Sequence, residues 1–264
     1  MSKNVSELTI VLPTINELEN LKKLIPELIS VINETQIKDF EILVVDDGST
    51  DGTVEFIDDF KNINHHISFI KRKNEPSLPI SIWEGISASK YEFVLWMDAD
   101  GSMPPYVVKK LIFALSDNPN SVVIGSRFAE GGGYKGIKEL GKTGFFEAIK
   151  NVYHSNDSVF GMIFSTLFNK FLNIIFKTNL TDITSGFILG KKSFFTEEQF
   201  NNSEYGEYFI YMLSDLINKK VKLIEIGYIC ETRIAGVSKT ATNIGQLIIR
   251  GIPYIQAAIK VRYK

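Results

Sequence analysis

Two aspartates, Asp98 and Asp100, come directly after the strongly apolar run of residues 93–97. A β-strand places alternate residues on the same face, so carboxylates two positions apart can point the same way. Two carboxylates held close together repel each other unless a cation lies between them. A hard divalent cation, Mg²⁺ or Mn²⁺, prefers oxygen ligands and often bridges to substrate phosphates. The pair therefore predicts a metal-dependent site for a phosphate-bearing substrate.

A simpler interpretation of the same residues is a solvated turn between a strand and a helix, in which aspartate is a common turn former. An EF-hand is excluded, because the position that would need a bidentate glutamate holds Lys109. The choice between a turn and a metal site depends on what the rest of the chain places beside the pair.

Short apolar runs alternate with helical-period segments over the first half of the chain. The runs are residues 8–12, 40–45, 67–70, 91–97 and 122–124, and the segments between them are 18–32, 54–60, 80–89 and 105–115. Asn16 is predicted to cap the first helix, with Glu19 completing a capping box. The alternation predicts an α/β fold with a mostly parallel sheet flanked by helices.

Polar clusters follow four of the predicted strands, at residues 13–17, 46–51, 98–100 and 125–127. Ligands of such sheets bind at the carboxyl ends of the strands, so these clusters are expected to form one site. Residues 131–136 match G-x-G-x-x-G and residues 136–143 match G-x-x-x-x-G-K-T by letter, but neither match lies between a predicted strand and a predicted helix, so the usual dinucleotide and P-loop phosphate sites are not indicated.

The second half of the chain is less regular. Residues 131–157 are loop-rich, an apolar stripe of helical period runs through 160–175, and another strand is predicted within 221–229. We expect a catalytic domain over residues 1–239, with 131–180 as a variable loop and amphipathic helix, followed by a basic amphipathic segment, 240–264. The stripe fits either a core helix or a membrane-facing one.

Composition limits the class of protein. An apolar fraction of 44% and a charged fraction of 23% are ordinary for a globular chain, and a net charge of −2 gives no support for nucleic-acid binding. The single cysteine, Cys230, fits a reducing cytosol, and the polar N-terminus does not resemble a signal peptide. After Glu231 the chain has six basic residues and no acidic one. This predicts peripheral attachment to an anionic membrane surface, and the alternative is that the tail packs on the sheet or pairs with another subunit.

Taken in order, the motifs resemble those of family 2 glycosyltransferases with the GT-A fold, most of all the dolichol-phosphate mannosyltransferase-like group. The motifs are P-T-I-N-E at 13–17, D-D-G-S-T-D-G-T at 46–53, D-A-D at 98–100 with Pro104-Pro105, G-S-R at 125–127, T-S-G-F at 184–187 and R-x-x-G-x-S-K at 233–239.

The resemblance implies a role for each matching position. A nucleotide would be lined by Pro13, Thr14, Glu17, Asp46, Asp47, Ser49 and Asp98. Asp98 and Asp100 would bind the diphosphate directly or through Mg²⁺ or Mn²⁺, with Ser102 also beside the metal. Arg127, Arg233 and Lys239 would meet phosphates.

Four positions depart from that group. Ile15 stands where a tyrosine is common, Ser102 replaces a glutamine beside the metal, and Ser77-Leu78-Pro79 replaces a Gly-Leu-Gly turn. No arginine lies near Met162, where the group binds the acceptor phosphate before Ser165 and Asn169.

The expected reaction is transfer of a sugar, with inversion, from a GDP- or UDP-sugar to a polyprenyl phosphate. A glycan hydroxyl is the alternative acceptor. A phosphate acceptor is already anionic and needs no strong base, whereas a hydroxyl needs one, and Asp182 is then the candidate, equally readable as a helix cap or turn residue. A sugar-nucleotide pyrophosphorylase would want a glycine-rich, lysine-bearing loop at 13–17, and a non-catalytic nucleotide-sugar-binding module would not need both aspartates.

Overall fold

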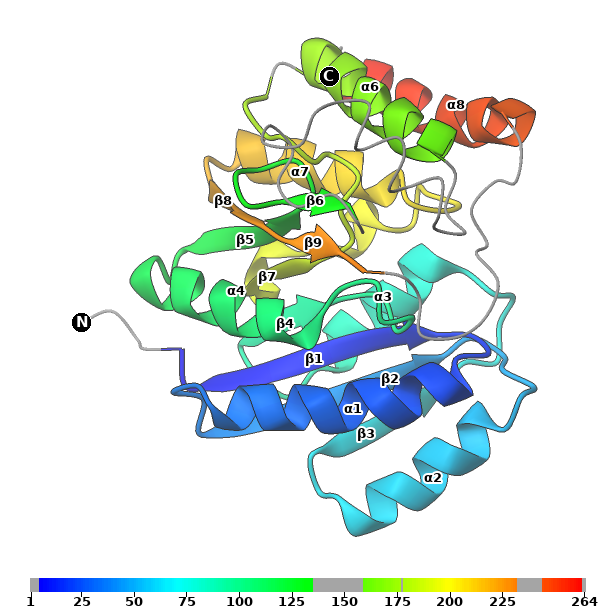
Figure 1. The fold of residues 1–264 in the computed structure, drawn as a ribbon, viewed down its shortest axis with the longest axis vertical. Coiled ribbons are helices and arrows are strands. Elements are labelled where there is room, and N and C mark those ends of the chain that lie inside the picture. Colours follow the sequence, from blue (N-terminus) through cyan, green and yellow to red (C-terminus); the bar gives the residue numbers. More distant parts are fainter. Residues whose placement is uncertain (1–4, 135–158, 177, 232–243, 263–264) are drawn as a thin grey trace.

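A computed structural model describes residues 5–134, 159–176, 178–231 and 244–262; for 134, 159–164, 244–248 and 250 it describes the backbone alone. The chain builds one seven-stranded sheet in the order β3-β2-β1-β4-β7-β5-β8 (Figure 1). The strands are β1 (Glu7–Thr14), β2 (Asp39–Asp46), β3 (Ile67–Lys71), β4 (Phe93–Trp96), β5 (Ser121–Ser126), β7 (Ile188–Lys191) and β8 (Lys222–Gly227). Every pairing is parallel except the two made by β7. The mostly parallel α/β sheet expected from the sequence is confirmed.

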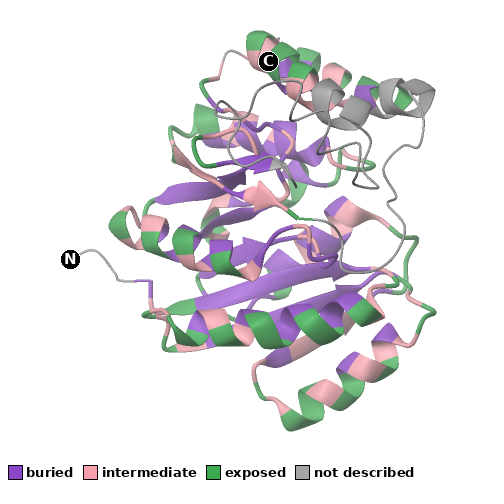
Figure 2. Cartoon of the chain, viewed as in Figure 1, coloured by how far each residue is buried: buried purple, intermediate pink, exposed green. Residues whose placement is uncertain are grey.

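Two hydrophobic cores lie on the two faces of this sheet. Successive strand residues alternate between them, so Ile10 and Leu12 of β1 belong to one core and Val11 to the other. The first face is covered by α1 (Leu18–Asn33), α2 (Thr53–Ile63) and α4 (Pro105–Asp117), and the second by α3 (Leu78–Ala88) and α7 (Tyr208–Asn218). Figure 2 shows the resulting pattern, with buried strands at the centre and exposed residues on the outer helix surfaces.

Neither β7 nor α7 was predicted from the sequence. β7 lies between β4 and β5 and runs against both, so the fourth and fifth predicted strands are not neighbours. The predicted strand within 221–229 is divided, because β8 ends at Gly227 and β9 (Ile229–Cys230) pairs instead with β6 (Gly133–Tyr134).

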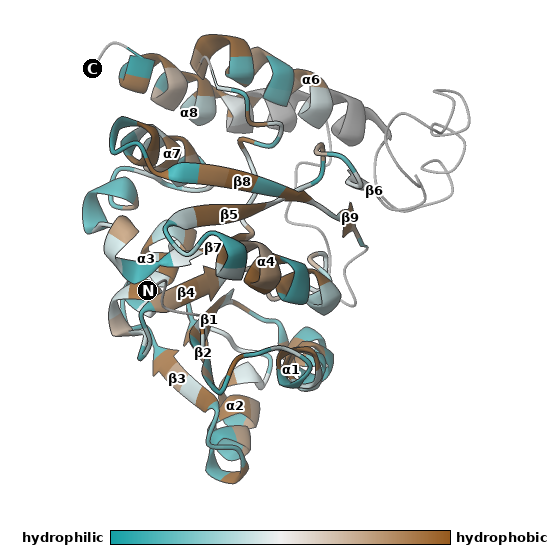
Figure 3. Cartoon of the chain, turned by 90° about the vertical axis from the view of Figure 1, so that its left-hand side faces the viewer, coloured by the Kyte–Doolittle hydropathy of each residue, from teal (hydrophilic) through white to brown (hydrophobic). Residues whose placement is uncertain are grey.

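Helices α6 (Val159–Phe176) and α8 (Ile244–Arg262) pack on each other, and α8 also packs on α7 (Figure 1). Leu172 of α6 and Ala257 and Ala258 of α8 are fully buried in the second core. Leu167, Phe171 and Ile174 lie on the other side of α6, with 60%, 46% and 74% of their surfaces exposed. The apolar stripe predicted over 160–175 therefore faces outward at these three positions, and Figure 3 shows apolar residues along both helices.

The part of the chain that the structure describes contains no helix with both the length and the apolar character needed to cross a bilayer.

Candidate active site

The site lies where the parallel strands end. β1, β2, β4, β5 and β8 run in the same direction, so their carboxyl ends share one edge of the sheet. β7 runs the opposite way and begins at that edge, which places the preceding Thr184–Phe187 motif there as well. The tertiary structure thus brings the T-S-G-F motif to the same edge as the four polar clusters.

Asp98 and Asp100 follow β4 at this edge. Asp100 is 5% exposed, and its Oδ1 accepts a hydrogen bond of 2.9 Å from the Ser102 amide. Asp98 is half-buried, and a Cβ added at Gly186 would lie 3.7 Å from its Oδ1. The T-S-G-F motif therefore lies beside the first aspartate.

Within the described residues, no group of three or more His, Cys, Asp or Glu side chains is arranged to hold a metal ion. Mg²⁺ does not require such a group, because it is usually bound by one or two carboxylates, retained water and substrate phosphates. The carboxylates of Asp98 and Asp100 fit this kind of site. Ser102, predicted to lie beside the metal, is in the same loop, where its amide binds Asp100.

The first two polar clusters form a joined pair of loops. Asn16 adopts a left-handed backbone with φ of 55°; its amide donates to Ser49 Oγ (2.8 Å), and its Oδ1 accepts from the Thr50 amide (2.7 Å). The prediction that Asn16 caps α1 was wrong. Glu17 occupies the cap position without a capping side-chain bond, and Asp51 of the other loop accepts the Leu18 amide instead (3.1 Å). The loop after β2 thus supplies the cap for α1.

The predicted nucleotide-lining residues after β2 are engaged in building the loop. Asp46 is fully buried and accepts the amides of Gly48 and Ser49. Asp47 accepts from the Ser77 amide (2.6 Å) and from the buried guanidinium of Arg72. Sequence reasoning missed Arg72, although an arginine directly after β3 could have signalled it. Contacts of Pro13, Thr14, Glu17, Asp46, Asp47 and Ser49 with a nucleotide remain a prediction.

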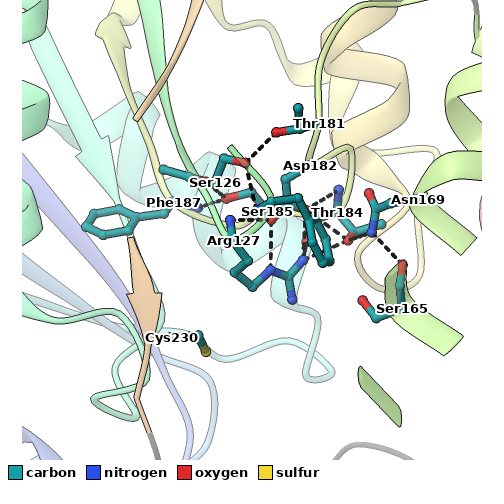
Figure 4. A network of polar contacts seen from close by, with 12 residues as sticks. Ser126, Arg127, Ser165, Asn169, Thr181, Asp182, Thr184, Ser185, Phe187 and Cys230 are labelled. Atoms are coloured by element: carbon teal, nitrogen blue, oxygen red, sulfur yellow. Dashed lines mark hydrogen bonds and ion pairs between the residues drawn. The ribbon is translucent and has the colours of Figure 1, made fainter. Parts of the chain in front are cut away.

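Arg127 and Asp182 form the best-defined polar contact at this edge (Figure 4). Arg127 Nε and Nη2 each donate to one carboxylate oxygen of Asp182 at 2.8 Å, and the Arg127 amide donates to Oδ2 at 3.1 Å. The Thr184 amide and hydroxyl both donate to Oδ1 at 3.2 Å. Asp182 is fully buried, so this two-pronged contact fixes the guanidinium at the end of β5.

The electrostatics of Asp182 bear on the general-base interpretation. Burial by itself raises the pKa of the Asp182 carboxyl, but the Arg127 charge and the hydrogen bonds outweigh it, so the pKa lies below its ordinary value. A carboxylate with both oxygens engaged and a lowered pKa is a poor proton acceptor. The geometry favours a positioning role for Asp182 over the predicted role as a general base.

Arg233 and Lys239 lie outside the described residues. Glu231, the last described residue before them, donates its amide to the Ser102 carbonyl at 2.9 Å. The chain therefore leads into that segment beside the Asp98–Ser102 loop.

The model for glycosyl transferase family 2 matches residues 9–197, which include most of β1, the elements from β2 to β7 and all the site residues above except Glu231, Arg233 and Lys239. The chain is a family 2 glycosyltransferase. Its described part has the mostly parallel sheet with helices on both faces that was expected from the sequence, and the family match confirms the resemblance.

Among curated proteins, this glycosyltransferase is 32% identical over 127 residues to dolichol-phosphate mannosyltransferase of Saccharomyces cerevisiae, covering 48% of this chain and 47% of that one. It is 34% identical over 126 residues to the enzyme of that name from Pyrococcus furiosus, covering 48% and 34%. It is 27% identical over 127 residues to undecaprenyl-phosphate 4-deoxy-4-formamido-L-arabinose transferase of Proteus mirabilis, covering 47% and 38%. Each match spans less than half of the relative's length.

Among solved structures, the glycosyltransferase resembles glucosyl-3-phosphoglycerate synthase of Mycobacterium tuberculosis in complex with Mn²⁺, UDP and phosphoglyceric acid. The TM-score is 0.62 at 15% identity, over 97% of this chain and 78% of that one. Mannosyl-3-phosphoglycerate synthase of Rubrobacter xylanophilus gives 0.62 at 15% identity, over 96% and 73%. At these identities the likeness establishes the GT-A fold of the chain and nothing about its substrates.

Proposed function

We propose that this glycosyltransferase moves a sugar, with inversion, from a GDP- or UDP-sugar to a polyprenyl phosphate. The choice of acceptor rests on the burial of Asp182 and on its ion pair with Arg127. A sugar hydroxyl would need a base, and the one carboxylate predicted for that task is buried in an ion pair with Arg127. A phosphate monoester is already anionic at neutral pH, so it can attack without one. The names of the aligned relatives point to the same acceptor class.

In this proposal the protein groups act on two charged partners. Asp98 and Asp100 would hold Mg²⁺ or Mn²⁺, and the metal would supply positive charge that offsets the negative charge developing on the leaving diphosphate. The residues that would line the nucleotide are Pro13, Thr14, Glu17, Asp46, Asp47, Ser49 and Asp98. Arg127 faces the acceptor phosphate, aided by Arg233 and Lys239 from the late segment. A guanidinium held in place before the substrate arrives needs little reorganisation during the reaction.

A screen of donors and acceptors tests this proposal. GDP- and UDP-sugars would be offered with Mg²⁺ or Mn²⁺ to a polyprenyl phosphate, to the matching polyprenol without phosphate, and to glycan acceptors. We expect a labelled polyprenyl-phosphate sugar from one donor, and no product from the polyprenol. Product formed only on a hydroxyl acceptor would overturn the assignment in favour of a role in polysaccharide synthesis. Sugar-nucleotide binding without turnover on any acceptor would indicate a non-catalytic module.

We also propose that the enzyme attaches peripherally to the cytoplasmic face of a membrane, where a polyprenyl phosphate would be presented. The exposed side of α6 carries Leu167, Phe171 and Ile174, and α8 carries exposed Ile252 and Ile259 beside the exposed basic residues Lys260 and Arg262. Apolar side chains next to Lys and Arg are the combination that binds an anionic bilayer surface.

Flotation with anionic vesicles measures this attachment. The protein is expected to float at low salt and to be released as salt rises, because charge attraction is screened. Replacing Phe171 and Ile174 by serine should weaken binding by about tenfold or more, since full burial of one such side chain contributes about 1.5–3 kcal/mol. Ile63→Ser is the matched control, because Ile63 is 81% exposed but lies on α2, at the other end of the molecule (Figure 1). Equal binding of both variants would exclude the α6 surface.

A further inference from the structure

Asn169 is a buried polar residue on a helix that otherwise turns an apolar side outward. It lies on α6 with only 2% of its surface exposed, on the side of the helix away from Leu167, Phe171 and Ile174. Its Nδ2 donates to the Ser165 carbonyl and to Thr184 Oγ1, both at 3.0 Å. Its Oδ1 accepts the Ile183 amide at 2.8 Å. One side chain therefore joins α6 to the loop that precedes β7.

The orientation of this amide is determined by its partners. Turning it over would place Oδ1 against the Ser165 carbonyl oxygen, and Nδ2 against the Ile183 amide nitrogen, so one contact would join two acceptors and the other two donors. In the observed orientation both amide hydrogens and the carbonyl oxygen are used. A fully satisfied buried amide of this kind favours a single arrangement of the groups around it.

The hydroxyl of Thr184 links Asn169 to the guanidinium of Arg127. It donates its one hydrogen to Asp182 Oδ1 (3.2 Å) and accepts from Asn169 Nδ2 (3.0 Å) and from Arg127 Nη2 (2.8 Å). A hydroxyl offers one donor and two lone pairs, so its bonding capacity is filled. Asn169 is thus one hydrogen-bonded group away from the Arg127 guanidinium (Figure 4).

The loop is also held from the opposite side. Glu225 of β8 accepts the Thr181 amide (2.7 Å), the Thr181 hydroxyl (2.9 Å) and the Asp182 amide (2.9 Å). Residues 181–184 therefore lie between β8, which fixes the start of the loop, and α6, which fixes its end through Asn169. β8 belongs to the seven-stranded sheet and α6 does not, so Asn169 ties the end of this loop to an element outside the sheet.

We propose that Asn169 is a positioning residue for the transfer reaction, which holds the Asp182–Thr184 loop so that Arg127 meets the acceptor phosphate in the productive orientation. This rests on the proposed function of Arg127 as the acceptor-phosphate group. Asn169 itself does not touch the substrate. Its effect should therefore fall on the acceptor and on the rate of transfer, and leave binding of the nucleotide at β1 and β2 unchanged.

The test compares Asn169→Ala with Asn173→Ala. Asn173 lies one turn further along α6, and its Oδ1 is buried with no hydrogen-bond partner among the described residues, so removing its amide cuts nothing in the network. We expect Asn169→Ala to lower kcat/KM for polyprenyl phosphate about 10- to 100-fold, the scale of a misplaced catalytic group. The Kd for the nucleoside diphosphate should stay within about twofold, and Asn173→Ala should stay within about twofold on both measures.

Two further measurements separate positioning from general stability. Hydrogen exchange at residues 181–187 should quicken in Asn169→Ala and not in Asn173→Ala, because the Ile183 amide loses its acceptor. The double variant Asn169→Ala/Thr184→Val should lose less activity than the two single losses combined, since both act through one hydroxyl.

The proposal is overturned if exchange at 181–187 is unchanged, if the two asparagine variants have equal activity, or if the Asn169 and Thr184 losses simply multiply. These outcomes differ from failure of the proposed function. If the wild-type enzyme transfers sugar only to a hydroxyl acceptor, the lipid phosphate is excluded as the acceptor. The Asn169 and Asn173 variants would then be compared in the same way on the hydroxyl reaction.

Discussion

Asp100→Asn is expected to lower the kcat for transfer by about 10²–10³-fold while leaving the fold intact. The substitution keeps the size of the side chain, and the amide oxygen can still accept the Ser102 amide that Oδ1 accepts in the native loop. It removes the charge that would hold Mg²⁺ or Mn²⁺ against the donor diphosphate. Losing one group that stabilises developing charge typically lowers kcat by about 10²–10³-fold. The measurement is kcat under saturating donor and acceptor, over a range of metal concentrations.

Asp58→Asn provides the control, because that aspartate lies on α2 in an exposed ion pair with Lys61, far from the strand ends. Binding of Mn²⁺ in the presence of a nucleoside diphosphate, measured by calorimetry, should weaken in the Asp100 variant and stay unchanged in the Asp58 variant. Normal turnover of the Asp100 variant at saturating metal would show that the carboxylate pair is only a solvated turn.

The second large effect is expected on stability, from Asp182→Ala. The change leaves the guanidinium of Arg127 without its buried partner, and breaking a buried pair in this way usually costs about 3–5 kcal/mol. The Arg127 side chain keeps 18% exposure and can partly rehydrate, so we expect the lower end, about 3 kcal/mol. Urea unfolding at pH 7 measures the loss, with Asp182→Asn as the companion variant that preserves shape, removes the charge and replaces one accepting oxygen by an NH2 donor.

The pH dependence gives this pair a separate signature. The pKa of Asp182 is lowered in the folded protein, so the stabilisation is present above the ordinary pKa of aspartate and is lost as pH falls through the lower folded value. The stability difference between wild type and Asp182→Asn should therefore be largest at neutral pH and shrink below about pH 4. Other carboxyl groups titrate in both proteins and cancel in the difference. A difference that is constant from pH 7 to pH 3 would contradict the ion pair.

Much of the fold could be predicted because its signals are local. The five predicted strands and the four helices between them were present with small shifts at their ends, since apolar periodicity reports which side of an element is buried. The convergence of the polar clusters followed from one rule, that parallel strands end at the same edge. β7 and α7 occupy residues 188–191 and 208–218, where the sequence predicted neither a strand nor a helix.

In the candidate site, too, some features could be predicted from the local sequence and others depended on tertiary contacts. Spacing alone pointed to Asp98 and Asp100, because two carboxylates after one strand need nothing from the rest of the chain to be neighbours. Asn16 looked like a helix cap by the same local rules, and the tertiary structure instead joined it to Ser49 and Thr50, more than thirty residues later. The capping pattern was present, but a loop from the next strand supplied a better partner.

The sequence by itself determined which edge of the sheet carries the polar clusters and which carboxylates lie there. Only the tertiary structure decided how the guanidinium of Arg127 is held at that edge. Arg127 and Asp182 are 55 residues apart and meet because β7 enters the sheet antiparallel between β4 and β5, which returns the preceding loop to the strand ends. No periodicity or spacing encodes that contact, since its energy comes from burying a charge pair whose members belong to different elements.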